Sequence, residues 1–243
     1  MSAGVERFSL TGRTCLVTGA AGQLGTAYSA ALEEAGASVI RADLNPGGGM
    51  EQVDVADEAS VRELFGRVSQ RTERLDVLVN NAGIGVYTPL EDRTVEELMR
   101  VEAVNLTGTA LMTRAALDLV PDGGSVINVG SIYGMVAPDP RIYGESGRNS
   151  SEIYGATKAG VIQMTKWFAI HCAPRRIRVN AITPGGVWAN QTEDFVRAYE
   201  QRTPLGRMAT PDDLTGALVY LASDASAYMT GQNLAVDGGW TAW

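Results

Sequence analysis

The sequence predicts a single α/β domain, residues 1–243, built on a doubly wound, seven-stranded parallel sheet with helices on both faces. The chain has 243 residues, of which 45% are hydrophobic and 20% are charged, and this suits one large core. Short runs rich in Val, Ile and Leu alternate with longer helix-compatible segments, which is the pattern of βαβ units. A glycine-rich turn joins the first such run to the first helix.

The first strand, Thr14–Thr18, leads into Gly19, Gly22 and Gly25 and then into an alanine-rich helical stretch. Glycines permit a sharp turn and let backbone N–H groups and a helix N-terminus approach a pyrophosphate. The spacing is G-x-x-G-x-x-G, so a plain βα turn is the alternative interpretation. We predict dinucleotide contacts here at Gly19, Gly22, Gln23 and Leu24.

The second strand, Ser38–Asp43, ends on an acid about twenty residues after the glycine turn, where a carboxylate can bond both ribose hydroxyls. A carboxylate there repels a 2′-phosphate, which favours NAD(H) over NADP(H). Arg41 keeps NADP(H) open, and a solvated Asp43 at a strand end is the alternative with no cofactor role.

The connection from Asp43 to Asp54 spans 11 positions, which is too short for a crossover helix. We therefore predict an abbreviated connection and a third strand over Val53–Val55, with Asp54 and Val55 near the adenine. Asp57 should cap the helix Glu58–Arg71.

A buried strand over Leu75–Asn80 should then run into Asn81, Ala82 and Gly83, whose small side chains let the backbone pass close to a cofactor. Thr94 has the position of an N-cap for a helix reaching Leu119. Asn105 interrupts the apolar pattern of that helix, and a buried amide there would hold a water or distort the helix.

The last strands are predicted at 125–131, 178–183 and 234–239, and Ser131 stands at the carboxyl end of the first of these, where open α/β sheets bind ligands. Pro184, Gly185 and Val187 turn the chain back after the sixth strand. Thr210 should cap the last helix.

Tyr154 and Lys158 stand four residues apart in a helix-compatible run and so share one helix face. A fixed ammonium favours the phenolate, so Lys158 together with a cationic nicotinamide ring should lower the Tyr154 pKa. The pair is typical of a general acid/base, although surface helices also carry such pairs.

Composition argues against several other classes of protein. The net charge is −8 and no Lys/Arg-rich run is present, which argues against nucleic acid as a partner. Cys15 and Cys172 lack disulfide or metal-ligand spacing, and the single His171 cannot build a metal cluster or a Ser-His-Asp triad. With no apolar run of the ~20 residues that cross a bilayer, we expect a soluble, cytoplasmic protein without metal or membrane partner.

Taken together, these motifs resemble the short, single-domain branch of the short-chain dehydrogenase/reductase family, which has a Rossmann-type fold. The match runs over nearly the whole chain, through Thr18-Gly19, Asn80–Gly83, Ser131, Tyr154-x-x-x-Lys158, Pro184-Gly185 and Val236–Gly239. The resemblance implies a catalytic tetrad of Asn105, Ser131, Tyr154 and Lys158. Ser131 would bond the substrate oxygen, Tyr154 would exchange its proton, Lys158 would hold the nicotinamide ribose and Asn105 would hold a relay water. The backbone of Val187 would fix the carboxamide.

The chain departs from the family pattern at three places. Gln23 replaces a usual glycine, and Ala189 replaces a threonine whose contact Asn190, Gln191 or Thr192 would take over. The third departure is the distance of 23 positions between Ser131 and Tyr154, which indicates an insert, residues 135–153. A polar insert tethered between catalytic residues should lie beside the substrate pocket, although a surface loop without substrate contact is the alternative.

The sequence therefore predicts an NAD(H)-dependent oxidoreductase that interconverts a secondary alcohol and a ketone, on a polar sugar-like or polyol substrate. The insert and Ser131–Gly134 resemble oxidoreductases of nonulosonic-acid and flagellin-glycan pathways. The alternatives are a 3-oxoacyl-thioester (acyl-carrier-protein) reductase and a non-catalytic NAD(H)-binding sensor or scaffold. Residues 188–207 should form a substrate lid, and the tail Gly238–Trp243 should be buried between the subunits of a homotetramer.

Overall fold

The computed structural model describes residues 3–146 and 148–243, so residue 147 of the predicted insert lies outside the described residues. Its centre is a parallel sheet of seven strands in the order β3-β2-β1-β4-β5-β6-β7. The strands are β1 Thr14–Thr18, β2 Ser38–Asp43, β3 Glu51–Gln52, β4 Val77–Asn80, β5 Ser125–Val129, β6 Arg178–Pro184 and β7 Asn233–Val236. The predicted fold class is confirmed.

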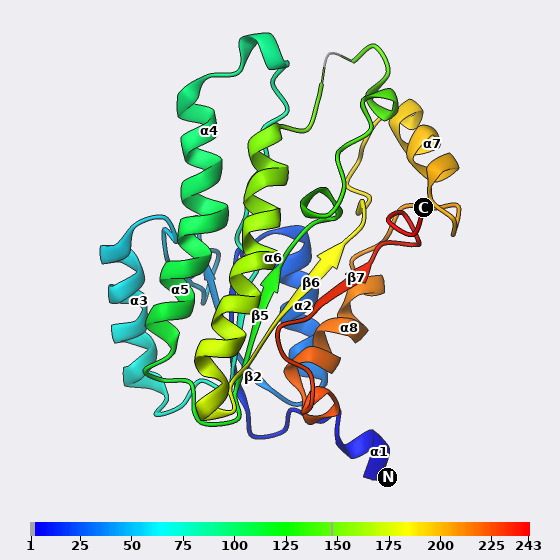
Figure 1. The fold of residues 1–243 in the computed structure, drawn as a ribbon. Helices are drawn as coiled ribbons and strands as arrows, with labels where there is room; N and C mark the ends of the chain where they lie inside the picture. Colours follow the sequence, from blue (N-terminus) through cyan, green and yellow to red (C-terminus); the bar gives the residue numbers. More distant parts are fainter. Residues whose placement is uncertain (1–2, 147) are drawn as a thin grey trace.

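Helices cover both faces of this sheet (Figure 1). One face packs against α3 Glu58–Arg71, α5 Gly108–Ala116 and α6 Glu152–Cys172. The other packs against α2 Gln23–Glu34 and α8 Asp212–Ala222. The remaining helices are α1 Ala3–Glu6, α4 Val95–Glu102 and α7 Glu193–Arg202. Along β1, Leu16 belongs to the first core and Cys15 and Val17 to the second, so successive side chains serve opposite faces.

The order of the strands fixes where a ligand can bind. The chain runs outward from β1 through β2 to β3, then returns to the other side of β1 with β4. Open α/β sheets bind ligands in the crevice at such a reversal, outside the carboxyl ends of the strands. We call this side of the molecule the carboxyl edge, and in Figure 1 it is the upper side of the sheet.

A third strand is present, but its predicted position is wrong. β3 comprises Glu51 and Gln52, which pair with Ala42 and Asp43, rather than Val53–Val55. The backbone N–H of Val53 still donates to the carbonyl of Asp43 at 2.9 Å, but β2 ends there and leaves no further partner in the ladder. As predicted, no helix separates β2 from β3 among these described residues.

The helix is distorted at Asn105, which is one of the two outcomes predicted for a buried amide there. Thr94 caps α4 in a capping box with Glu97, and a π-helical turn over Ala103–Thr107 connects α4 to α5. The combined helix ends at Ala116 rather than at Leu119. A π turn accommodates one extra residue and often marks a functional site.

The predicted Thr210 cap is wrong. α8 begins at Asp212 after Pro211, and the carboxylate of Asp213 instead accepts hydrogen bonds from the backbone N–H and the hydroxyl of Thr210. Arg207 holds that carboxylate through two bonds of 2.7 Å. The Asp57 cap of α3 is confirmed.

The C-terminal tail is divided between the interior and the surface. Trp240 is 1% exposed and stacks on Tyr199 with ring centroids 4.1 Å apart, whereas Trp243 is 76% exposed. Gly238 and Gly239 have positive φ angles of 66° and 89°, and this turn folds Trp240 back onto its own subunit. The expectation that the whole tail is buried between subunits is therefore wrong for Trp240.

Within the described residues, no helix combines the length and apolar character that a membrane span needs.

Candidate active site

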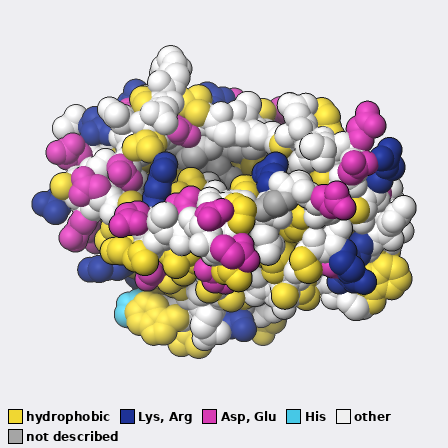
Figure 2. Space-filling view, turned by 90° about the horizontal axis from the view of Figure 1, so that it is seen from above, with side chains coloured by type: hydrophobic (Ala, Val, Ile, Leu, Met, Phe, Trp, Pro, Cys, Tyr) yellow, Lys and Arg dark blue, Asp and Glu magenta, His cyan; other side chains and the backbone are white. Residues whose placement is uncertain are grey.

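A cavity of about 830 Å³ opens at the carboxyl edge. Figure 2 looks onto this side of the molecule and shows a hollow with Lys or Arg side chains at its rim. Its walls come from the glycine turn, the ends of β4, β5 and β6, the start of α6, the insert and α7. Of the predicted site residues, the lining includes Gly19, Gly22, Gln23, Leu24, Asp43, Asn81, Ala82, Gly83, Ser131, Tyr154, Lys158, Pro184, Gly185 and Val187.

The glycine turn has no room for side chains. Gly19 has a φ of 63°, and a Cβ there would lie 2.9 Å from the Cα of Ala82. A Cβ on Gly25 would lie 2.1 Å from the carbonyl oxygen of Gly19. The backbone therefore forms a bare cradle at the start of α2, where the first N–H groups of a helix have no intrahelical partner. This cradle fits a dinucleotide pyrophosphate.

Two side chains connect the glycine turn to the rest of the site. The Asn81 amide donates to the carbonyls of Thr18 and Gly19 at 2.9 and 3.0 Å, which fixes the turn against the end of β4. The Gln23 amide donates to the carbonyl of Trp188 at 2.7 Å. Gln23, a departure from the family pattern, thus joins the turn to the predicted lid.

Asp43 stands at the end of β2 and lines the cavity. Its carboxylate accepts from the backbone N–H groups of Ala21 and Asn45, both at 3.0 Å, and these two bonds orient it. Arg41 forms an ion pair with Glu33 at 2.6 Å. This end of the cavity therefore has an oriented negative charge, and the nearby cation is already paired.

Two predicted cofactor contacts do not line the cavity. The Asp54 carboxylate accepts from its own loop, at the N–H of Ala56, 2.9 Å away. Val55 is 7% exposed and packs on Gly108, where a Cβ would lie 2.8 Å from the Val55 side chain. Both residues follow β3, which ends at Gln52. The segment after it packs against the start of α5 instead of lining the cavity.

Asn105 supports the site without lining it. Its amide oxygen accepts from the N–H of Ile84 at 2.8 Å, and its amide nitrogen donates to the Ile84 carbonyl at 2.9 Å. This reciprocal pair pins the segment after β4. Asn105 Oδ1 and Lys158 Nζ would each lie 3.3 Å from a Cβ on Gly83, so a side chain there would press on both groups.

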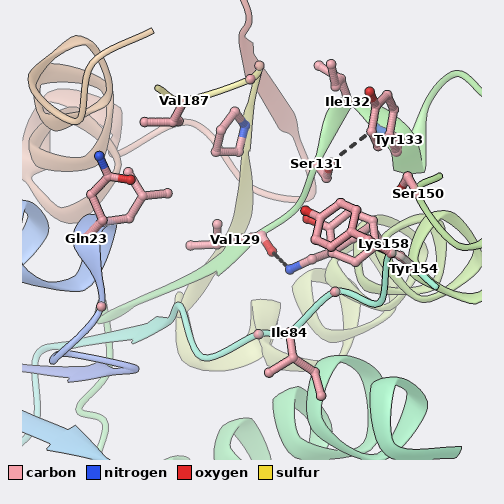
Figure 3. A pocket seen from close by; sticks show the side chains of 18 of the residues that line it. Gln23, Ile84, Val129, Ser131, Ile132, Tyr133, Ser150, Tyr154, Lys158 and Val187 are labelled. Carbon is pink, nitrogen blue, oxygen red and sulfur yellow. Dashed lines mark hydrogen bonds between the residues drawn. The ribbon is translucent and has the colours of Figure 1, made fainter. Parts of the chain in front are cut away.

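Ser131, Tyr154 and Lys158 come together at one wall of the cavity (Figure 3). Ser131 ends the segment after β5, and its hydroxyl oxygen accepts from the N–H of Tyr133 at 3.2 Å. Tyr154 and Lys158 lie in the first turns of α6, which Ser151 caps. Lys158 Nζ donates to the Val129 carbonyl at 2.7 Å and lies 5.9 Å from the centre of the Tyr154 ring.

Burial dominates the acid–base properties of this pair. It raises the pKa of Tyr154 to about 12, although a hydrogen bond with Ser131 acts in the opposite direction. It lowers the pKa of Lys158 to about 8. The expectation that Lys158 together with a nicotinamide ring lowers the Tyr154 pKa stays a prediction for the cofactor-bound protein.

The insert borders the cavity. Its residues Tyr143, Ser146, Arg148 and Ser150 all line the wall beside Tyr154. A short helical turn, Pro140–Tyr143, anchors the insert, since Ile142 and Tyr143 are buried in a cluster with Tyr199 and Trp240. These described residues of the insert border the cavity, and contact of the insert with a substrate stays a prediction.

The loop after β6 closes the far wall. Gly185 must be a glycine, because a Cβ there would lie 2.8 Å from the Cα of Asp237. Of the three candidates to replace the absent threonine, Gln191 and Thr192 line the cavity and Asn190 does not. The Gln191 amide donates to the carbonyl of Val187 at 2.9 Å and so fixes the residue expected to bind the carboxamide.

Several lining side chains were not predicted, among them Tyr87, Tyr133, Phe195, Tyr199 and Met208. They come from loops and from α7, where side-chain direction depends on tertiary packing. The polar and aromatic composition of residues 188–207 is a signal for Phe195 and Tyr199 alone.

The fold and the site define a class of protein. A glycine turn at the reversal point of a doubly wound sheet is a dinucleotide-binding site, and a tyrosine with a lysine one helical turn later at the same cavity supplies an acid/base. The family model described as Enoyl-(Acyl carrier protein) reductase matches residues 19–241. The chain belongs to the short-chain dehydrogenase/reductase family.

Characterised relatives differ in substrate and cofactor. The 3-oxoacyl-[acyl-carrier-protein] reductase of Thermotoga maritima is 36% identical, over 95% of this chain and 98% of its own. A short-chain dehydrogenase of Leptospira borgpetersenii with bound NAD+ is 41% identical, with a TM-score of 0.88 over 95% of this chain and 93% of its own. A gluconate 5-dehydrogenase of Burkholderia cenocepacia, in complex with NADP and tartrate, is 30% identical, with a TM-score of 0.88 over 98% and 99% of the two chains.

Proposed function

We propose that this protein is an NAD(H)-dependent oxidoreductase that interconverts a secondary alcohol and a ketone on a polar, sugar-like or polyol substrate. One observation carries the proposal: Ser131, Tyr154 and Lys158 line the same cavity as the glycine cradle. An acid/base and a dinucleotide site in one cavity are what hydride exchange at a CH–OH group needs.

The side chains have separate tasks in this proposal. Ser131 donates a hydrogen bond to the substrate oxygen, and Tyr154 exchanges a proton with that oxygen. Because the pKa of Tyr154 is about 12, its hydroxyl is protonated at neutral pH and is ready to donate when a ketone is reduced. Lys158 holds the ribose, and Asn105 keeps the segment after β4 in place and a relay water nearby. The nicotinamide supplies or accepts the hydride.

The proposed preference for NAD(H) rests on Asp43 and Arg41. The oriented Asp43 carboxylate suits two ribose hydroxyls and repels a 2′-phosphate. Arg41, the nearby cation able to neutralise that phosphate, is paired with Glu33. Titration with NADH and NADPH, followed by fluorescence, tests this. We expect the wild type to bind NADH more tightly than NADPH, and Asp43→Asn should narrow this difference in affinity. Tighter binding of NADPH by the wild type would contradict the proposed preference.

The polar substrate class rests on the hydroxyl groups around Tyr154. Tyr143, Ser146 and Ser150 of the insert and Tyr133 beside it line this wall, and such groups orient a polyol better than an acyl chain. A panel of polyols, sugars and a 3-oxoacyl thioester tests the class. Turnover of the thioester alone would establish the runner-up, an acyl-carrier-protein reductase, which the Thermotoga relative brings into consideration. NADH binding without any turnover would establish a sensor or scaffold.

The finer resemblance to nonulosonic-acid and flagellin-glycan enzymes stays part of this proposal, and sugars of that class belong in the panel. The buried free thiols of Cys15 and Cys172 suit a cytoplasmic setting, which we also propose.

We further propose a homotetramer. Trp167 and Ile170 on α6 are 58% and 78% exposed, and Met99 on α4 is 64% exposed. Figure 2 shows apolar side chains beside the single histidine, His171, whose ring stacks on Trp167. Large exposed apolar side chains on two adjacent helices are typical of subunit interfaces, and the exposed Trp243 is a second candidate contact.

A further inference from the structure

One cation of the cavity wall, Arg148, rests on an aromatic ring and has no carboxylate partner among the described residues. Arg148 lines the cavity, and its guanidinium lies 4.7 Å from the centre of the Tyr87 ring. The backbone of the next residue, Asn149, donates to the Tyr87 carbonyl at 3.4 Å. A guanidinium on an aromatic face is held in one orientation while its N–H groups stay free to bind an anion.

The other arginines near the insert are already paired. Arg141 and Arg202 both bond Asp139 at 2.7 Å, and Arg93 pairs with Glu152. Among the described residues, no carboxylate lies within ion-pair distance of Arg148. Arg148 therefore differs from its neighbours in facing the cavity without a carboxylate partner.

The charges along the cavity are unevenly distributed. The described lining has one carboxylate, Asp43, which stands at the glycine turn. The other charged groups of the described lining are two cations, Lys158, which lies 5.9 Å from the centre of the Tyr154 ring, and Arg148 of the insert. The chain as a whole has a net charge of −8, so a positive substrate end is a local feature of the site. A cavity of one charge sign concentrates ligands of the opposite sign.

We infer that the substrate is an anion, a polyhydroxylated compound with a carboxylate or phosphate group, and that Arg148 binds that group at the cavity mouth. The inference rests on the proposed function, which supplies the reacting alcohol at Tyr154. It adds to that function a specificity residue from the insert. Ser146 fixes the backbone of Arg148, because its hydroxyl donates to the Tyr143 carbonyl at 2.6 Å and accepts from the Arg148 N–H at 3.3 Å.

Calorimetric titration of the NADH-saturated enzyme with a matched set of six-carbon compounds tests the inference. The probes are glucitol, which is neutral, gluconate, which has a carboxylate, and glucitol phosphate. The wild type should bind at least one of the two anions about tenfold or more tightly than glucitol, since a charge-assisted hydrogen bond contributes about 1.5–3 kcal/mol. Which anion binds better distinguishes the carboxylate from the phosphate.

Two variants and one control test whether Arg148 causes the preference for anions over glucitol. Arg148→Gln should remove the preference for the anion and leave glucitol binding unchanged, and Tyr87→Leu should reduce the preference because the guanidinium loses its support. Arg141→Gln, in the same insert but bonded to Asp139, should keep the preference. An anion preference that survives Arg148→Gln would overturn the inference. So would anions that bind no better than glucitol, including the case in which no probe binds at millimolar concentration.

Turnover measured on the same samples separates this inference from the proposed function. If glucitol or another neutral polyol is oxidised with NAD+ while the anions show no advantage, the proposed function stands and the inference fails. If the anions bind through Arg148 but no alcohol of any panel turns over, the anion site stands and the proposed function fails.

Discussion

Lys158 is a lysine that is almost completely removed from water. It is 5% exposed, and its ammonium has one hydrogen-bond partner in the structure, the Val129 carbonyl. Burial without a carboxylate partner disfavours the charged form, which lowers the Lys158 pKa from 10.5 to about 8. The same desolvation raises the Tyr154 pKa, so burial shifts both groups toward their neutral forms, although a Lys158 pKa of about 8 leaves it mostly charged at pH 7.

The depressed Lys158 pKa predicts a pH dependence of stability. Between pH 8 and pH 10.5 the unfolded chain binds a proton at Lys158 that the folded chain has lost, so the wild type gains stability as the pH rises. Relative to Lys158→Met, the wild type should gain about 3 kcal/mol across this window. Urea unfolding of both proteins at pH 7, 9 and 10.5 measures it. A stability difference that is constant with pH would contradict the lowered pKa.

At the residue scale, the sequence predicts those residues whose positions are set by local backbone structure. The glycine turn, Asp43, Ser131 and the Tyr154–Lys158 pair all follow from spacing within one strand, turn or helix. Asp54 and Val55 failed because their position depends on where the β2–β3 ladder ends. The Arg148–Tyr87 contact joins two loops far apart in the sequence, and no local pattern predicts such a contact.

At the scale of elements, the glycine turn couples three segments. Gly25 lies in the first turn of α2, directly against the Gly19 carbonyl, and the Asn81 amide donates a hydrogen bond to that carbonyl from the end of β4. A side chain at Gly25 must push these segments apart. The cradle for the pyrophosphate therefore depends on close backbone contact rather than on a charged side chain.

Gly25→Ala should weaken NADH binding by about tenfold or more, because the new Cβ would lie 2.1 Å from the Gly19 oxygen and distort the cradle. Fluorescence titration with NADH measures the change. The control is Gly66→Ala in α3, where a Cβ meets nothing within 4 Å; it should leave NADH binding intact and stabilise the helix by up to about 1 kcal/mol. Equal NADH affinity of the two variants would refute the role of the cradle.

The predicted lid, residues 188–207, contains α7 and is attached to the site at a few points. The Trp188 carbonyl accepts from Gln23, and the Arg202 guanidinium bonds Asp139 of the insert. Because NADH would add contacts along this segment, limited proteolysis within 188–207 should slow when NADH is present. Gln23→Ala should speed cutting, and Gln70→Ala on the exposed face of α3 should not. Identical cutting with and without NADH would remove the lid hypothesis.

The elements themselves were mostly predictable because buried parallel strands appear as continuous apolar runs. β1, β2, β4, β5, β6 and β7 all lie within or next to the predicted ranges. β3 was misplaced because a strand of two residues is set by its neighbour's register, not by its own composition. The Thr210 side chain does not cap the helix because its hydroxyl donates to the Asp213 carboxylate, which Arg207 also holds, instead of accepting from a helix N–H.

At the scale of the whole molecule, the C-terminal tail shows that residue type alone does not predict a subunit interface. Two tryptophans near the C-terminus suggest an interface, but Trp240 is buried against Tyr199 and Tyr143, two residues that line the cavity. Deleting residues 240–243 would therefore damage the site as well as any assembly. Trp243 alone stays available for contact with another subunit.

Trp243→Ala should weaken the proposed homotetramer without loss of fold, because this side chain is 76% exposed. Light scattering over a range of protein concentrations measures the assembly. Tyr228→Ala, at a fully exposed tyrosine, is the matched control and should leave the assembly unchanged. A wild type that is monomeric at every concentration would refute the tetramer, and a tetramer insensitive to Trp243→Ala would refute the role of the tail.

The proposed function depends most directly on Tyr154 as the acid/base of a dinucleotide-dependent reaction. The decisive measurement is turnover by wild type and Tyr154→Phe on a substrate drawn from the polyol and sugar panel, with NADH binding recorded for both proteins. We predict a loss of about a hundredfold or more in kcat with NADH affinity preserved, since the phenol acts on the substrate oxygen. Equal turnover by the two proteins, or a wild type that binds NADH and turns over nothing, would contradict the central claim.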